Sequence, residues 1–442
     1  MSRALGSGQT GVQTATMVAW LGLSLACVVL GCSPESVTPG SGTGGVPGTG
    51  GTTAPGGSPA TGGRASTTGG NASQGGTPGT GGAAGTSTGG KATGGTSTGG
   101  RTTGGTATGG KATGGTGAGG GCGVTAPAGS PVATHGQLQV VGNRIQDQSG
   151  NPVQLKGISS YWLNWESSSR AYSQSRSALQ YARDNWKLSI IRAAMGVDAS
   201  GGYLTSTSAR TSMQAKVDTI VQNALALGVY VLIDWHTERA VDQQAESIEF
   251  FTGMANKYGA CPNVLYEDYN EPTSVTWAQI KPYHQAVVNA IRAVDPDNVI
   301  ILGTPNWSQD VDVAAASPVT GTNLAYTLHF YSCSHGSGLR TKGTTALSRG
   351  VALFVTEFGA TPANGGVSPN NTVCEAEANS WFAWMEQNGV GGTAWKLSQG
   401  TDSSHLLTSS APVDGPWTDS VLTTTNGSPR GHGLFIVNWI RQ

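Results

Sequence analysis

The chain has 442 residues, a net charge of −1 and only 11% charged residues. A nearly neutral chain lacks the broad positive surface that binds nucleic acid or an anionic membrane through charge alone. Neither is therefore expected as a partner. Composition is uneven, because most of the 69 glycines precede residue 122, whereas nearly all aromatic residues follow Gly136. Roughly 300 residues remain for a globular domain, enough for one large α/β core.

Residues 1–32 have the pattern of an export signal. Met17–Leu30 is a mostly apolar run that is short for a membrane span and typical of the hydrophobic region of a signal peptide. The run leads into Leu30-Gly31-Cys32, which is similar to the lipobox of bacterial lipoproteins. We therefore expect lipidation of Cys32 and a location at the cell surface or outer membrane, or secretion. This lipid anchor would be the only contact with a membrane; an ordinary cleaved signal peptide is the alternative.

Residues 33–121 have the composition of a linker. From Gly89 to Gly114 the unit Gly-Gly-x-x-Thr repeats with a period of five, and no position builds an apolar face. Such a segment cannot bury enough apolar surface to offset the entropy of folding. We expect a disordered Gly/Thr/Ser-rich tether that leads to a folded catalytic domain at residues 122–442.

Four cysteines follow the signal segment, at Cys122, Cys261, Cys333 and Cys374. An exported protein permits disulfides, and these spacings fit no zinc pattern. Four cysteines allow three pairings. We favour Cys333–Cys374, since both fall in loops after late strands, and Cys122–Cys261, which would fasten the start of the domain. No metal or cofactor is expected.

The globular part opens with a predicted β-hairpin, in which Leu138–Val141 and Arg144–Gln146 flank the turn pair Gly142-Asn143. Strand-like and helix-like segments then alternate, which predicts a (β/α)8 barrel. The expected helices include Ser208–Leu227, Ala240–Tyr258 and Thr276–Val294. The expected strands are Gln154–Ser160, Leu188–Ala194, Val229–Trp235, Val264–Asn270, Val299–Thr304, Leu324–Tyr331, Ala352–Gly359 and Gly392–Leu397.

Two of these strands end in a glutamate that is followed by a strand breaker. Glu271 precedes Pro272, and Glu357 lies two residues before Gly359. The carboxyl ends of barrel strands meet at one mouth, where barrel enzymes hold their catalytic groups. A single strand-end glutamate can equally face solvent, so the inference depends on the pair. The fourth and seventh strands are three steps apart round the barrel, which lets their ends face each other across the mouth.

Other polar and aromatic residues fall at the same strand ends. Singly, each has a structural explanation, because a strand-end histidine or tyrosine is usually a hydrogen-bonded structural residue. Together they fit glycoside hydrolysis, in which two carboxyl groups flank the scissile bond and indole faces stack on sugar rings. The candidates are Arg192, Trp235, His236, Asn270, Glu271, Trp307, His329, Tyr331, Glu357 and Trp395.

The ordered set of motifs resembles glycoside hydrolase family 5, in the branch of bacterial endo-β-1,4-glucanases. It covers about Leu138 to Trp439 and comprises Gly157-Ile-Ser-Ser160, Ile191-Arg-Ala-Ala-Met195, Asp234-Trp-His236, Asn270-Glu-Pro272, His329-Phe-Tyr331, Thr356-Glu-Phe-Gly359 and Trp395-Lys-Leu-Ser398. The resemblance implies that Glu271 is the general acid/base and Glu357 the nucleophile. It also implies that Asn270 bonds the sugar 2-hydroxyl, while Arg192 and Tyr331 hold the nucleophile. His236 and His329 would line the −1 site beside Trp395.

Several positions depart from the family pattern on the glycone side. Many relatives place His, Gln, Tyr and Lys where this chain has, in that order, Tyr161, Asn164, Gly196 and Gly400. Lys396 lies next to Trp395 instead, and we include Tyr161 and Lys396 among the substrate-binding residues. Trp165 is kept as an expected −2 stacking platform. Trp307 is expected to stack on the acceptor side, with a core role as the alternative.

These observations predict a retaining endo-β-1,4-glucanase that acts as a monomer on cellulose or related β-glucans. A mannanase or xyloglucanase on the same scaffold is the enzymatic alternative. A surface glycan-binding lipoprotein without activity is the alternative from another class. The presence of both Glu271 and Glu357 counts against a pure binder, which has no need of a paired acid and nucleophile.

Overall fold

The structure, a computed structural model, describes residues 122–366 and 371–442. The predicted signal segment, Cys32 and the linker at 33–121 lie outside the described residues. Within those residues, no helix is both long enough and apolar enough to cross a membrane.

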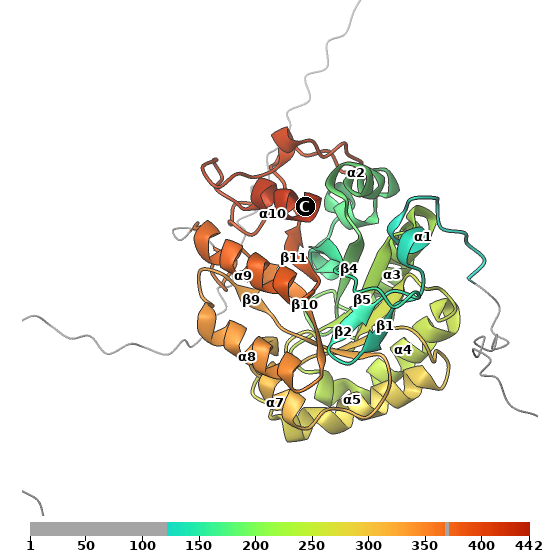
Figure 1. The fold of residues 1–442 in the computed structure, drawn as a ribbon. Coiled ribbons are helices and arrows are strands. Elements are labelled where there is room, and N and C mark those ends of the chain that lie inside the picture. The colour runs from blue at the N-terminus through green and yellow to red at the C-terminus, as the bar shows by residue number, and fades with distance from the viewer. Residues whose placement is uncertain (1–121, 367–370) are drawn as a thin grey trace, which may run out of the picture. The chain divides into compact units, whose positions relative to one another are not determined.

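Eight parallel strands close into a barrel (Figure 1). The strands are β3 (Lys156–Ser160), β4 (Ile190–Gly196), β5 (Tyr230–His236), β6 (Val264–Glu267), β7 (Ile300–Leu302), β8 (Leu324–Thr327), β10 (Ala352–Gly359) and β11 (Gly392–Leu397). They pair in this order, and β11 pairs with both β10 and β3, which closes the ring. The predicted (β/α)8 barrel is confirmed.

Helices surround the barrel and cover the outer face of its strands (Figure 1). The longer ones are α2 (Arg176–Trp186), α3 (Thr207–Leu227), α4 (Gln244–Tyr258), α5 (Trp277–Arg292), α8 (Ser337–Ser348), α9 (Glu375–Gln387) and α10 (Gly433–Arg441). Short helices are α1 (Pro131–His135), α6 (Pro305–Ser308) and α7 (Val311–Ala316). The expected helix at Ala240–Tyr258 is a 3₁₀ turn, Ala240–Gln243, that continues into α4.

Several expected strands are longer than the observed ones, and two of these differences lie at the site. The expected strand Leu324–Tyr331 is broken, because β8 ends at Thr327 and a separate strand, β9 (Phe330–Tyr331), pairs with the far end of β10. In the break, the backbone N–H of His329 donates to the carbonyl of Ser308. The strand expected to reach Asn270 stops at Glu267, which pairs with Ile301 of β7. Asn270 and Glu271 therefore lie on a loop beyond the barrel ladder.

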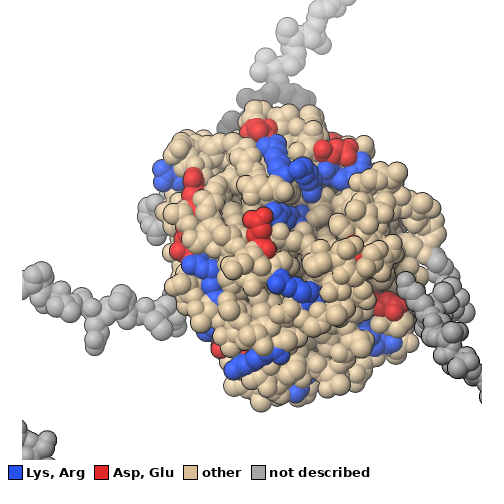
Figure 2. Space-filling model, viewed as in Figure 1, with Lys and Arg blue, Asp and Glu red and all other residues tan. Residues whose placement is uncertain are grey.

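The predicted hairpin closes one end of the barrel. β1 (Gln139–Val141) and β2 (Arg144–Gln146) pair antiparallel, and Ile145 joins the apolar cluster formed near the starts of the barrel strands by residues such as Leu232 and Leu265. On the face that carries this hairpin, charged side chains lie singly or in small groups (Figure 2). Because the N-terminal end is sealed by apolar packing, polar side chains gather at the other end of the strands.

Two disulfides fasten loops at different parts of the barrel. Cys122 bonds Cys261, in the connection that precedes β6. Cys333, two residues after β9, bonds Cys374, which precedes α9. These are the two pairings that the sequence analysis favours.

Candidate active site

A buried arginine lies at the centre of the barrel mouth. Arg192, on β4, has no exposed surface. Its guanidinium nitrogens lie 2.9 Å from Asp234 Oδ2, 2.8 Å from Glu267 Oε2 and 3.1 Å from Glu357 Oε2. It also donates to Asn270 Oδ1 at 2.6 Å. One side chain thus contacts groups from β5, β6, the loop after β6 and β10.

The cluster places three carboxyl groups around one cation. Burial alone would lower the pKa of Arg192, but the surrounding carboxylates raise it well above its usual value, so the guanidinium stays charged. Burial raises the pKa of Asp234 to about 8 and of Glu267 to about 7, and Arg192 partly offsets both shifts. The sequence analysis assigned no role to Asp234 or Glu267. A charged residue inside an apolar strand was the available signal for both.

Both carboxylate oxygens of Glu357 are held. Oε2 contacts Arg192, and Oε1 accepts a 2.6 Å hydrogen bond from the Tyr331 hydroxyl. Burial raises the pKa of Tyr331 well above its ordinary value, and the charge of Glu357 raises it further. Tyr331 therefore keeps its proton and acts as a fixed donor, which orients the Glu357 carboxylate toward the mouth.

Glu271 lies on the loop after β6 and faces Glu357. An oxygen of each carboxyl group lies within 4.8 Å of the other. The sequence offered no evident partner for Glu271, but its Oε1 lies 2.9 Å from Nδ1 of His329. Burial raises the pKa of Glu271 to about 8, and the nearby Glu238 adds to the rise while Arg192 opposes it. Because 18% of the side-chain surface stays exposed, we expect a smaller rise than full enclosure would give.

Glu271, His329 and Glu357 are also close enough together to offer ligand atoms to a metal ion. Their lone pairs are already engaged, since Glu357 binds Arg192 and Tyr331, and His329 Nδ1 contacts Glu271. A divalent cation there would also meet the repulsion of the Arg192 charge. The donor set therefore fits a hydrogen-bonded acid–base pair better than an open metal site.

His236 and Trp395 form one wall of the mouth. His236, at the end of β5, lies with Nδ1 2.7 Å from Asp234, and its ring stacks on Trp395 at 5.4 Å between centroids. Burial lowers the pKa of His236 to about 3, and the Arg192 charge lowers it too, so the imidazole is neutral. Trp162, which the sequence analysis did not single out, meets this histidine edge-on at 4.2 Å.

A pocket of about 230 Å³ continues from this wall, lined in part by Tyr161, Trp165, Lys396 and Asp402. The Tyr161 ring lies between Trp165 and Trp395, at 5.8 and 6.1 Å between centroids. The Lys396 amine lies 4.9 Å over the Tyr161 ring and 3.2 Å from Asp402. Trp165 is 47% exposed and so presents a free indole surface at the pocket.

Two of the departures from the family pattern are glycines that neighbouring side chains require. A Cβ at Gly196 would lie 2.0 Å from Asn164 Oδ1, and a Cβ at Gly400 would lie 1.9 Å from Nε2 of His405. Asn164 and His405 therefore occupy the space that side chains at these two positions would need. His405 in turn binds Asp402 at 2.8 Å, so the pocket wall is charged even without a lysine at position 400.

The two remaining tryptophan candidates differ. Trp307 is 47% exposed, and its backbone N–H donates to the carbonyl of Pro272, which places it beside the Glu271 loop. The expectation that Trp235 lies at the mouth is wrong. It is fully buried against Phe250 on α4, because its strand neighbours Asp234 and His236 face the mouth and strand side chains alternate.

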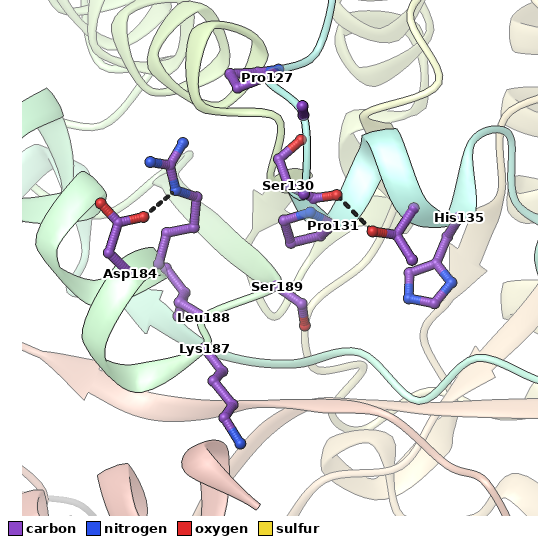
Figure 3. A pocket seen from close by; sticks show the side chains of 12 residues that line it. Pro127, Ser130, Pro131, His135, Asp184, Lys187, Leu188 and Ser189 are labelled. Atoms are coloured by element: carbon purple, nitrogen blue, oxygen red, sulfur yellow. Dashed lines mark hydrogen bonds and ion pairs between the residues drawn. The ribbon is translucent and has the colours of Figure 1, made fainter.

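A larger hollow, of about 450 Å³, lies away from the two glutamates. It is formed by residues 127–135, around α1, and 183–189, which lead into β4 (Figure 3). Within it, Arg183 pairs with Asp184 and the Thr134 hydroxyl donates to the Ser130 carbonyl. Because Ser189 precedes the start of β4, this hollow lies near the N-terminal end of the barrel strands and has no part in the chemistry at the mouth.

A parallel α/β barrel with two carboxyl groups facing each other at its mouth, and indole rings beside them, defines a barrel glycoside hydrolase. The family model "Cellulase (glycosyl hydrolase family 5)" matches residues 146–401, which is more than half of the chain. The chain belongs to glycosyl hydrolase family 5.

Named relatives and solved structures agree with this family. An endoglucanase of Clostridium saccharobutylicum is 42% identical over 308 residues, which are 68% of this chain and 64% of the relative. Endoglucanase Z of Dickeya dadantii is 42% identical over 269 residues, 61% of this chain and 60% of the relative. The chain thus spans less than two thirds of either relative. The catalytic domain of Thermobifida fusca endoglucanase Cel5A has a TM-score of 0.64 at 30% identity, covering 71% of this chain and 100% of that one.

Replacing the central arginine is expected to destabilise the fold. Arg192→Met leaves three buried carboxyl groups without their cation, which costs about 3–5 kcal/mol of the free energy of unfolding. The matched control is Arg239→Met, because Arg239 pairs with Asp242 on the surface, with both side chains more than 60% exposed. Its loss should be about 0–1 kcal/mol. Denaturant unfolding measures both, and equal losses would contradict the central role of Arg192.

Proposed function

We propose that the protein is a retaining endo-β-1,4-glucanase that cleaves internal bonds of cellulose or related β-glucans. The observation that carries this proposal is the spacing of the two glutamates, whose nearest oxygens lie within 4.8 Å. Retaining enzymes hold their carboxyl groups about 5–5.5 Å apart, whereas inverting enzymes need about 6.5–9.5 Å to admit a water. The endoglucanase names of the relatives support a β-1,4-glucan as the substrate. So does the Cel5A domain solved in complex with cellotetraose, at 30% identity and a TM-score of 0.62.

In the first step, Glu357 attacks the anomeric carbon while Glu271 protonates the departing glycosidic oxygen. The contacts with Arg192 and Tyr331 hold the attacking carboxylate in place. The raised pKa of Glu271 keeps it protonated near neutral pH, as a general acid requires. In the second step, Glu271 takes a proton from water, and that water hydrolyses the glycosyl-Glu357 intermediate.

Asn270 is oriented to bind the sugar 2-hydroxyl. Arg192 occupies its amide oxygen at 2.6 Å, so the amide nitrogen is the group left to donate. The orientation of the amide follows from this hydrogen bond, because a guanidinium can only donate. A hydrogen bond to the 2-hydroxyl that strengthens in the transition state contributes to catalysis.

The aromatic residues divide between the two sides of the scissile bond. Trp395 and His236 flank the −1 site, and Trp165 with Tyr161 and Lys396 extends it on the glycone side. Trp307, beside the Glu271 loop, would stack on the acceptor side. A sugar chain held on both sides of the cleavage point suits endo-acting hydrolysis. Reducing-sugar release from carboxymethylcellulose should exceed that from galactomannan and xyloglucan. The reverse order would indicate that mannan or xyloglucan is the substrate.

The two disulfides are typical of an exported protein. We infer that the enzyme works outside the cytoplasm as a monomer, with Cys32 carrying a lipid anchor and residues 33–121 acting as a tether to the domain at 122–442. Labelled fatty acid should enter the full chain but not its Cys32→Ala variant. Equal labelling of the two would show that Cys32 is not the lipidated residue.

Azide rescue assigns the two glutamates. Glu357→Ala with an activated β-cellobioside and azide should give the α-glycosyl azide, because azide then replaces the nucleophile directly. Glu271→Ala should give the β-glycosyl azide, because azide enters after the covalent intermediate has formed. Proton NMR of the products distinguishes the two anomers. The same anomer from both variants would contradict the proposed roles.

The pH dependence follows from the raised pKa of Glu271. The acid step needs the protonated form, so kcat/KM should fall as the pH rises through the raised pKa of Glu271, at or below about 8. The profile of kcat/KM reports the free enzyme. A 2,4-dinitrophenyl substrate, whose leaving group needs no proton, should lack this fall. If kcat/KM for the 2,4-dinitrophenyl substrate also fell at high pH, a group other than Glu271 would cause the alkaline limb.

A further inference from the structure

A buried chain of hydrogen bonds leads from the barrel wall to Glu271. The Thr356 backbone N–H contacts Thr327 Oγ1 at 3.3 Å, and the two threonine hydroxyls bond each other. Thr356 Oγ1 lies 2.7 Å from His329 Nε2, and His329 Nδ1 lies 2.9 Å from Glu271 Oε1. Thr327 and Thr356 have no exposed surface, and His329 is 2% exposed.

The direction of this chain depends on which acceptors its two hydroxyls can reach. The Thr356 N–H can only donate, so Thr327 Oγ1 accepts from it, and in one direction the Thr327 hydroxyl donates to Thr356 Oγ1. The Thr356 hydroxyl is then left to donate to His329 Nε2. A neutral imidazole that accepts at Nε2 carries its proton on Nδ1, where it donates to Glu271 Oε1.

The opposite direction leaves a buried hydroxyl unsatisfied. If His329 Nε2 donated to Thr356, the Thr356 hydroxyl would donate to Thr327 Oγ1. The Thr327 hydroxyl would then have no acceptor among the described residues. Buried polar groups without a partner are rare and costly, so the first direction is favoured.

The surroundings keep His329 neutral, as this reading requires. Burial lowers its pKa to about 4; the Glu357 charge opposes that shift, and Arg192 adds to it. Glu267 lies 3.9 Å from His329 Nε2, beyond hydrogen-bond range, and is held by Arg192 instead. The titratable groups that face His329 or Glu271 from the neighbouring elements are Arg192, Asp234, His236, Glu238, Glu267, Tyr331, His335 and Glu357.

We propose that the Thr327–Thr356 hydroxyl pair fixes His329 with its proton on Nδ1, so that the catalytic proton of Glu271 resides on Oε2. The inference rests on the proposed role of Glu271 as the general acid/base. With Oε1 accepting from His329, the proton of the acid form stays on the oxygen that can face the glycosidic bond. In the other tautomer, Nδ1 would accept, and Oε1 would turn its proton toward the histidine and away from the substrate. Thr356 and Thr327 are thus positioning residues that act through His329.

Imidazole ¹⁵N NMR tests the tautomer directly. The protein has seven histidines, and comparison with the spectrum of His329→Gln assigns the signals of His329. In the wild type, Nδ1 should show the shift of a protonated nitrogen and Nε2 that of an unprotonated one. In Thr356→Val, which keeps the shape but loses the hydroxyl, the two shifts should move toward each other as the tautomers mix. A protonated Nε2 in the wild type would overturn the proposal.

Leaving-group dependence tests the consequence for catalysis. With aryl β-cellobiosides of poor leaving groups, Thr356→Val should lose about 10- to 100-fold in kcat/KM, less than the full 10²- to 10⁴-fold that general acid catalysis supplies, because Glu271 itself remains. With 2,4-dinitrophenyl β-cellobioside the loss should be less than about threefold, because that group leaves without protonation. The alkaline limb should move to higher pH, since Glu271 loses a donor that stabilises its ionised form. Thr356→Ser, which restores the hydroxyl, should rescue both effects.

The matched control is Thr393→Val. Thr393 is also buried, and its hydroxyl donates to the Thr356 carbonyl, but it lies outside the hydroxyl chain. It should lower stability without changing leaving-group dependence. If Thr356→Val and Thr393→Val changed the leaving-group dependence equally, the effect would come from general disruption of the fold, and the proposal would be overturned.

Glu271→Ala separates this inference from the proposed function. A steep leaving-group dependence in Glu271→Ala, together with wild-type dependence in Thr356→Val, would overturn the inference alone. A flat dependence in Glu271→Ala would remove the acid role on which the inference rests.

Discussion

The buried charge of Arg192 is the constraint on which the mouth of the barrel depends. Its planar guanidinium offers donors in fixed directions, and these directions decide where Asp234, Glu267 and Glu357 can lie. Buried ion pairs cost desolvation and are weak evidence of stability in themselves. What this cluster provides is geometry. Arg192 contacts Glu357, the proposed nucleophile, on β10, and it also binds Asn270, the residue before Glu271. The same cation therefore positions both glutamates.

The two glutamates are held by different kinds of structure. Glu357 lies within β10, at an irregularity between two positions that pair with β11, and two side-chain donors hold its carboxylate. Glu271 lies on a loop beyond the last ladder position of β6, where its backbone N–H donates to the Thr237 carbonyl and its side chain meets His329. A nucleophile must aim at one atom from a fixed place, whereas an acid/base acts on two oxygens, first in the leaving group and then in water. The early end of β6 and the break after β8 bring Glu271 and His329 into contact.

The barrel and its two glutamates could be predicted from the sequence, because apolar runs that end in a polar residue and a breaker are a local pattern. The ends of β6 and β8 could not, because they depend on pairing with strands that are distant in the sequence, and β10 runs on past the end of β8 to pair with β9. Trp235 was predicted to lie at the mouth because it ends the expected strand Val229–Trp235, yet the alternation of side chains along the strand points it toward the helices. The sequence around Asp234 and Glu267 did not indicate that both form ion pairs with Arg192. The Thr327–Thr356 contact depends on the register between β8 and β10, which no local pattern reveals.

The departures from the family pattern show how a site can change its lining and keep its chemistry. Gly196 lies beside Asn164, and Gly400 beside His405, at distances that leave no room for a Cβ at either glycine. Each glycine is therefore matched by a neighbouring side chain: Asn164 fills the volume beside Gly196 at the end of β4, and His405 fills the volume beside Gly400 in the connection after β11. Such exchanges preserve close packing, which interiors require, and they stay clear of the contacts of Arg192. Because Gly400 and His405 line the pocket beside Trp165, the lining of this pocket can vary without disturbing Glu271 and Glu357.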